Sequence, residues 1–77
     1  MLWVVAGCLF EVSLPSSSGP WRWTNPSAEV TLLAEEEREA RHHFRFRAEA
    51  PGEVDLQFVA AGHTASQTVQ IAPEKLV

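Results

Sequence analysis

Apolar and polar residues alternate one by one along most of this chain. The alternation is found in six segments, LFEVSLP, WRW, EVTLL, HFRFRAEA, VDLQF and TVQI. In the longest of them, Phe44 and Phe46 alternate with Arg45 and Arg47. Successive side chains of a strand point to opposite faces, so a period of two is typical of strands with one buried and one solvated face. The pattern predicts sheets rather than helices.

Turn-forming residues separate the alternating segments. Proline, glycine, serine and asparagine gather at residues 15–20, 25–27, 51–52 and 60–63. These residues favour turns because proline fixes φ, glycine accepts positive φ, and short polar side chains bond to nearby backbone. With residues 2–6 as a first strand, about seven short strands result. We therefore expect one all-β domain over residues 1–77, a small antiparallel immunoglobulin-like β-sandwich.

One segment departs from the alternation. Residues 32–44, LLAEEEREARHHF, are rich in helix formers, and Glu37 and Arg41 have the i,i+4 spacing of a favourable helical pair. One or two helical turns are therefore one interpretation of this segment. The other is a solvated loop or strand end, because so short a helix is not stable without packing.

The two tryptophans of WRW have two interpretations. On an alternating strand, Trp21 and Trp23 face inward and Arg22 faces outward, which predicts core positions for both rings. We expect this more firmly for Trp23, because Trp21 lies nearer the loop. Aromatic rings beside an arginine can also stack on bases or sugars. Nucleic acid has little support as a partner, because the net charge is −4 and the sequence contains no basic stripe that could bind phosphates.

The sequence offers no constellation that indicates catalysis or metal binding. His42 and His43 are neighbours, which on a strand point to opposite faces, and His63 is distant in sequence. No spacing of possible ligands is diagnostic of a metal, and no G-x-S-x-G turn is present. We expect neither an enzyme nor a bound metal or cofactor.

The first eight residues, MLWVVAGC, bear on compartment. They lack the basic region and the longer apolar stretch of a signal peptide. VAGC is similar to a lipobox ending at Cys8, although a strand-like segment follows at once. One cysteine excludes an internal disulfide framework and favours a reducing compartment, or export without disulfides. We expect a cytoplasmic protein, or a secreted or periplasmic one if a longer precursor exists, with no membrane span.

The order of these segments resembles the chagasin-like inhibitors of papain-type cysteine proteases. The family pattern G-x-x-F-x-V-x-L-P and, later, F-x-F-R-A-x-x-x-G-x-x-x-L-x-F is matched over nearly the whole chain by Gly7, Phe10, Val12, Leu14, Pro15, Phe44, Phe46, Arg47, Ala48, Gly52, Leu56 and Phe58. The resemblance implies an immunoglobulin-like sandwich in which three loops at one end enter a protease cleft.

The chain departs from the family in the loops. SSSGP replaces the family's N-P-T-T-G, EEEREARHH replaces a glycine-rich loop, and AAGHTAS replaces an R-P-W/F loop. Carried over by position, the resemblance implies a set of protease-binding residues in the first and third loops: Ser16, Ser17, Ser18, Gly19, Pro20, Trp21, Gly62 and His63.

Two functions remain open from the sequence. The first is an inhibitor that blocks the active-site cleft of a papain-like protease with these loops. The second is a non-inhibitory immunoglobulin-like module that binds another protein, because sandwiches of this kind have many functions. In both cases we expect a monomer with a protein partner.

Overall fold

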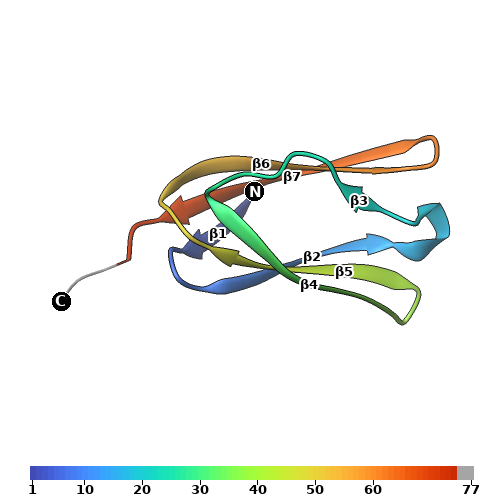
Figure 1. Cartoon of the computed structure of the whole chain (residues 1–77), viewed down its shortest axis with the longest axis horizontal. Helices are drawn as coiled ribbons and strands as arrows, with labels where there is room; N and C mark the ends of the chain where they lie inside the picture. The colour runs from blue at the N-terminus through green and yellow to red at the C-terminus, as the bar shows by residue number, and fades with distance from the viewer. Residues whose placement is uncertain (75–77) are drawn as a thin grey trace.

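Seven strands form two sheets that pack face to face (Figure 1). The computed structural model describes residues 1–74. The elements are β1 (Leu2–Val5), β2 (Leu9–Pro15), the 3₁₀ turn η1 (Ser16–Ser18), β3 (Arg22–Trp23), β4 (Val30–Arg38), β5 (Arg41–Ala48), β6 (Gly52–Ala60) and β7 (His63–Ala72). The predicted all-β sandwich is confirmed.

The strand order is that of an immunoglobulin-like sandwich. One sheet has the order β1-β7-β6-β3 and the other β2-β5-β4. In the lettering used for that architecture, β3, β6 and β7 correspond to strands C, F and G, and β2, β5 and β4 to strands B, E and D. The first strand joins the C-F-G side.

One ladder of the predicted antiparallel sandwich is parallel. β1 runs parallel to β7, with Leu2 opposite Val69 and Val5 opposite Ala72. Gly7 follows with a φ of 90°, a conformation natural to glycine, and the chain then enters β2 in the other sheet. Alternation reports the faces of a strand but not the direction of its neighbour, so the sequence pattern contains no signal for this ladder.

The alternating residues build the core as the pattern predicts. β5 and β6 have strictly alternating burial over Phe44–Ala48 and Val54–Phe58. Phe46 lies at the centre, with its ring centroid 5.3 Å from that of Phe10 and 5.0 Å from that of Trp23. The buried apolar side chains are Phe10, Val12, Trp21, Val30, Phe44, Phe46, Ala48, Val54, Leu56, Phe58, Val69 and Ile71.

The helical interpretation of residues 32–44 is wrong. This segment is the outer part of the β4–β5 hairpin, which pairs from Val30 opposite Ala48 to Arg38 opposite Arg41. The register shifts between Leu32 and Ala34, where a bulge lies in β4. The ladder with β5 gives β4 backbone hydrogen bonds along its inner side, whereas a helix of one or two turns is not stable without packing.

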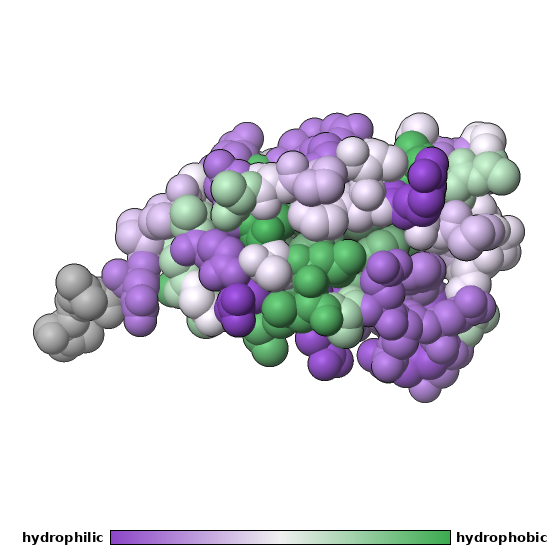
Figure 2. Space-filling model, in the orientation of Figure 1, coloured by the Kyte–Doolittle hydropathy of each residue, from purple (hydrophilic) through white to green (hydrophobic). Residues whose placement is uncertain are grey.

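The face of the molecule shown in Figure 2 has an apolar region and a hydrophilic region. Apolar surface lies across the middle, between the edge strands β3 and β4, and hydrophilic surface covers the β4–β5 hairpin. β4 also carries the exposed side chain of Leu33. The hairpin therefore extends a charged arm beyond the apolar core.

Candidate binding end

Three connections lie at the same end of the molecule (Figure 1). They are the β2–β3 connection with η1, the β4–β5 turn and the β6–β7 turn. We call this the loop end, made of residues 16–21, 39–40 and 61–63. The structure thus brings together the two groups of residues that the sequence resemblance names, Ser16 to Trp21 and Gly62 with His63.

The first of the three connections is held at both sides. The Ser16 N–H donates to the Ala40 carbonyl at 2.9 Å, which joins η1 to the β4–β5 turn. The Gly19 N–H donates to the Ser16 carbonyl at 3.0 Å and closes the 3₁₀ turn. The Gly19–Pro20 peptide is cis. The two hydrogen bonds give the serine segment a defined shape rather than that of a free linker.

Trp21 supports this connection from below. Its side chain is 5% exposed, and its Nε1–H donates to the Pro15 carbonyl at 2.8 Å. A Cβ added at Gly19 would lie 3.2 Å from Trp21 Cδ1, so the loop backbone packs directly on the ring. Trp21 is therefore a support for the loop and offers little surface to a partner.

The expected order of burial for the two tryptophans is reversed. Trp23 is only half-buried, and its Nε1 is buried without a hydrogen-bond partner within residues 1–74. The fold of η1 over Trp21 explains the reversal, because position in an alternating strand does not reveal what a neighbouring loop covers.

The other residues of the predicted set divide by exposure. Ser17, Pro20, Gly62 and His63 are exposed, so their side chains or backbone can touch a partner. Three residues are half-buried beneath them: Ser16, Ser18 and Gly19. The available surface of the loop end is thus small and polar.

Two residues of the loop end were not among those that the sequence predicted. Glu39 and Ala40 form the β4–β5 turn, are exposed, and have φ values of 55° and 62°. Two residues at positive φ fit a two-residue hairpin turn of the kind that Asn-Gly prefers. Because neither residue favours this conformation, the sequence contains no turn signal here, and helix propensity dominates.

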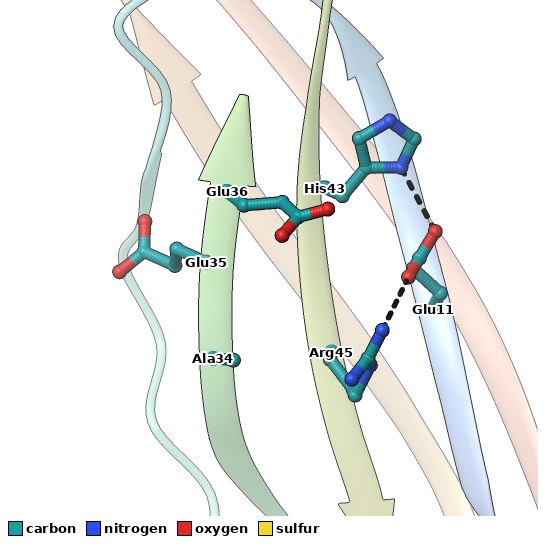
Figure 3. Close-up of a pocket in the computed structure, with 6 residues that line it drawn as sticks. All are labelled: Glu11, Ala34, Glu35, Glu36, His43 and Arg45. Carbon is teal, nitrogen blue, oxygen red and sulfur yellow. Dashed lines mark hydrogen bonds and ion pairs between the residues drawn. The ribbon is translucent and has the colours of Figure 1, made fainter. Parts of the chain in front are cut away.

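A hollow lies outside the loop end, on the solvent face of the three-stranded sheet (Figure 3). Its lining comes from β2, β4 and β5: Glu11, Ala34, Glu35, Glu36, His43 and Arg45. Glu11 lies in the middle of the charges, 2.8 Å from His43 Nδ1 and 3.7 Å from an Arg45 nitrogen. The charges of this hollow are therefore largely paired with one another.

Arg38 ties the hollow to the hairpin arm. It pairs with Glu36 and lies 3.6 Å from Glu11. The hydrogen bond from Arg38, followed by its charge, lowers the pKa of Glu36 below the ordinary range. The charges of the hollow and those of the hairpin arm therefore form one connected group through Arg38.

The described residues also yield two negative findings. Within residues 1–74, no three histidine, cysteine, aspartate or glutamate side chains are grouped so that they could hold a metal ion. In the same part of the chain, no helix has the length and apolar character needed to cross a membrane.

Comparison with known proteins found no relative of the chain. No family model, no curated protein and no solved structure matches it.

Proposed function

We propose that the protein is a protein-binding sandwich that uses its loop end to block the active-site cleft of a papain-like cysteine protease. The observation that carries the proposal is the gathering of three turns at one end, with η1 bonded to the β4–β5 turn through Ser16 and Ala40. The resemblance to chagasin-like inhibitors, in which three loops enter the cleft, supports the protease as target.

The loops are suited to act as a plug. A narrow cleft accepts backbone and small side chains, and the first loop presents Ser17 and Pro20 with little bulk behind them. The loop is ordered before binding by the bonds of Ser16, Gly19 and Trp21. Binding through such a loop loses less conformational entropy than binding through a flexible one. No bond to the protease is made or broken in this mechanism.

The test is a titration of papain-type proteases with the protein, read by hydrolysis of a fluorogenic peptide. We expect reversible, competitive inhibition at a protein concentration of about 10 µM or below. Ser17→Arg, which adds bulk at the exposed tip, should weaken inhibition at least about tenfold. Glu53→Gln, on the exposed face of β6, is the matched control and should inhibit like the unchanged protein.

Two results would contradict the proposal. One is the absence of inhibition across the panel at about 100 µM folded protein. The other is inhibition that Ser17→Arg leaves unchanged, which would mean that the first loop does not enter the cleft.

A second candidate function is a non-inhibitory interaction module. One feature of the loop end favours this module over an inhibitor. Arginine and aromatic side chains dominate binding energies, but Trp21 is buried and the β6–β7 turn offers only His63. The side chains that would anchor the loop end in a protease cleft are therefore few. A variant with glycine at residues 16–20 separates the two candidates. Loss of partner capture by this variant, with no inhibition by the unchanged protein, supports the module.

A further inference from the structure

β1 is an edge strand that lacks the usual protection against pairing. Its outer side has no partner strand within residues 1–74. Residues 1–5, MLWVV, contain no charged side chain, proline or glycine. The other edges are protected: β3 has two residues, β2 ends at Pro15, and β4 has a bulge and three glutamates at 35–37. Charge, proline, bulges and short length are the features that prevent edge-to-edge pairing.

The exposed side chains of this strand are apolar. Met1 and Trp3 are each 69% exposed, and Val5 is 41% exposed, whereas Leu2 and Val4 are half-buried against the core. Exposed and inward positions therefore alternate symmetrically about Trp3. A two-fold axis through Trp3 would match outward residues with outward residues and inward with inward.

The backbone of β1 has the same symmetry. The Ala6 N–H donates to the Ala72 carbonyl at 2.9 Å, in continuation of the β1–β7 ladder. In a parallel ladder, alternate residues direct their N–H and C=O groups to the same neighbour. Leu2 and Val4 therefore direct theirs to β7, as Ala6 directs its N–H. Trp3 directs both groups, and Val5 its N–H, to the open side, while the Val5 carbonyl accepts a hydrogen bond from the Cys8 N–H at 3.0 Å.

From these features we infer that two copies of the chain pair through β1, antiparallel, about a two-fold axis at Trp3. Trp3 lies opposite Trp3 of the second copy as a hydrogen-bonded pair, because the groups of this residue face the open edge. Met1 lies opposite Val5 of the second copy, and the inward faces of the two sheets become continuous. The ladder ends at Val5, since the chain then leaves the sheet and the Gly7 N–H donates to the Ala48 carbonyl.

A second copy fits this edge better than a charged partner would. The side chains of the edge are uncharged, while each copy carries a net charge of −4. β1 pairs with residues 69–72 of β7, far from the β6–β7 turn, so the antiparallel pair directs the two loop ends away from each other. The acidic β4–β5 hairpins then lie at opposite ends, which limits repulsion between the copies.

The size of the contact sets its strength. A buried tryptophan removes about 150–250 Å² from water, so a Trp3 that is 69% exposed offers about 100–170 Å² per copy. Each copy adds only the four other residues of the segment 1–5 to this contact. The total surface buried in the interface therefore stays below about 1,200 Å², which is the class of weak complexes. We therefore expect a dissociation constant of about 10–1,000 µM. The monomer expected from the sequence is then the dilute state of the protein.

Sedimentation equilibrium over a range of concentrations tests the pairing. We expect reversible dimers that strengthen with added salt, because screening reduces the repulsion between two acidic copies. Trp3→Lys should weaken dimerisation at least about tenfold, since it sets two charges against each other at the axis. Leu33→Lys adds the same charge to an exposed apolar site on the β4 edge and should leave the dimer intact.

A cross-link tests the register. Opposed residues of a hydrogen-bonded antiparallel pair have Cα atoms about 5.5 Å apart, within the range that a disulfide spans. Trp3→Cys in a Cys8→Ser background should therefore form covalent dimers with oxidised glutathione, which accepts the two electrons. Leu33→Cys in the same background is the control and should remain monomeric.

Three outcomes would overturn the inference. They are a monomer up to about 1 mM, a dimer that Trp3→Lys leaves unchanged, and a dimer lost on Leu33→Lys alone. Circular dichroism of each variant shows whether it is folded. Because β1 lies outside the loop end, none of these outcomes affects the proposed function, which is tested by protease inhibition alone.

Discussion

At the scale of single residues, Trp21 in the loop end and Trp23 in β3 differ in the hydrogen bonding of their ring nitrogens. Trp21 Nε1 donates to the Pro15 carbonyl, and Trp23 Nε1 is buried without a partner within residues 1–74. A buried N–H group without a bond carries a cost, whereas a bonded one contributes about 0.5–1.5 kcal/mol. Two residues that look equivalent in the sequence therefore contribute differently to stability.

Phenylalanine substitutions measure this difference. Trp21→Phe removes the bond and leaves the Pro15 carbonyl unpaired, while Trp23→Phe removes an unpaired donor. Both lose a similar ring volume, so each is the control for the other. We expect Trp21→Phe to lower the free energy of unfolding by about 1 kcal/mol more than Trp23→Phe, measured by urea denaturation. An equal loss would show that the Trp21 bond contributes nothing net.

The turn residues of the β4–β5 hairpin carry backbone strain. Glu39 and Ala40 have positive φ, which costs a residue with a Cβ roughly 1–2 kcal/mol. Asn-Gly adopts this turn with much less strain, although glycine adds entropy to the unfolded chain, about 0.4–1 kcal/mol. One of the strained residues, Ala40, accepts the hydrogen bond from Ser16, so the strain is located in the loop end.

Replacement of the turn should stabilise the protein. We expect Glu39→Asn with Ala40→Gly to raise the free energy of unfolding by about 1 kcal/mol, since strain relief exceeds the entropy cost. Ala28→Gly, at an exposed turn where φ is not positive, is the control and should instead lower it. Thermal and urea denaturation of both variants give the comparison. A loss of stability in the double variant would mean that the turn is not strained.

At the scale of elements, β5 is the strand on which the three-stranded sheet depends. It pairs with β2 on one side and β4 on the other. Its buried Phe46 contacts the rings of Phe10, Trp23 and Phe58, so it joins both sheets. Its exposed residues, among them Arg45, make ion pairs on the solvent face. The inward residues of β5 therefore contribute mainly to the stability of the fold, and the outward residues mainly to the surface charge.

Alanine substitutions at neighbouring positions of β5 test this separation. Phe46→Ala should lower the free energy of unfolding by about 3–5 kcal/mol, enough to unfold a domain of ordinary stability of about 5–15 kcal/mol in part or in full. Arg45→Ala, one position along, removes an exposed pair and should cost about 0–1 kcal/mol. Similar losses at both positions, measured in urea, would contradict the assigned faces of β5.

The elements also show what the sequence could and could not predict. Strands with strict alternation, such as β5 and β6, were predictable because their residues have one buried and one wet face. The outer half of β4 was not, because Glu35, Glu36 and Glu37 are exposed and their propensity favours helix. Only pairing with β5, a contact outside the local segment, decides its conformation.

The candidate site was predictable to a similar degree. Positions Ser16 to Pro20 and Gly62 with His63 were indicated by turn residues and by the family resemblance, and the topology places them at one end. The burial of Trp21 and the turn at Glu39 and Ala40 were not, because both depend on how η1 packs against the hairpin.

At the scale of the whole molecule, stability should depend on pH through three carboxylates. Glu29 accepts a hydrogen bond from Ser27, Glu36 from Arg38, and Glu49 from Arg47 and Thr31. These bonds hold the pKa of each of the three carboxyls below its ordinary value. A pKa lowered by folding stabilises the native state above the unfolded pKa, about 4.3 for glutamate, and this contribution is lost as the pH falls.

Acid titration measures this contribution. We expect the free energy of unfolding to be nearly constant above about pH 5 and to fall below about pH 4.3. Replacing Glu29, Glu36 and Glu49 by glutamine should make the fall shallower, as followed by urea midpoints at each pH. Glu53→Gln, at a carboxylate with no side-chain hydrogen bond within residues 1–74, should keep the original slope. A triple variant as steep as the unchanged protein would assign the acid sensitivity to other groups.

The parallel ladder between β1 and β7 decides when the chain can complete its fold during synthesis. Of the seven strands within residues 1–74, β1 is made first and its one neighbour in the sheet, β7, is made last, with Leu2 opposite Val69. Val69 is the 67th residue after Leu2, so at about 5–20 residues per second it is added about 3–13 s later. Contacts so distant in sequence also form late after release, because loop closure must come first. The apolar segment LWVV therefore stays without its β7 partner until the last of the described strands has been made, and it is open to chaperones during that time.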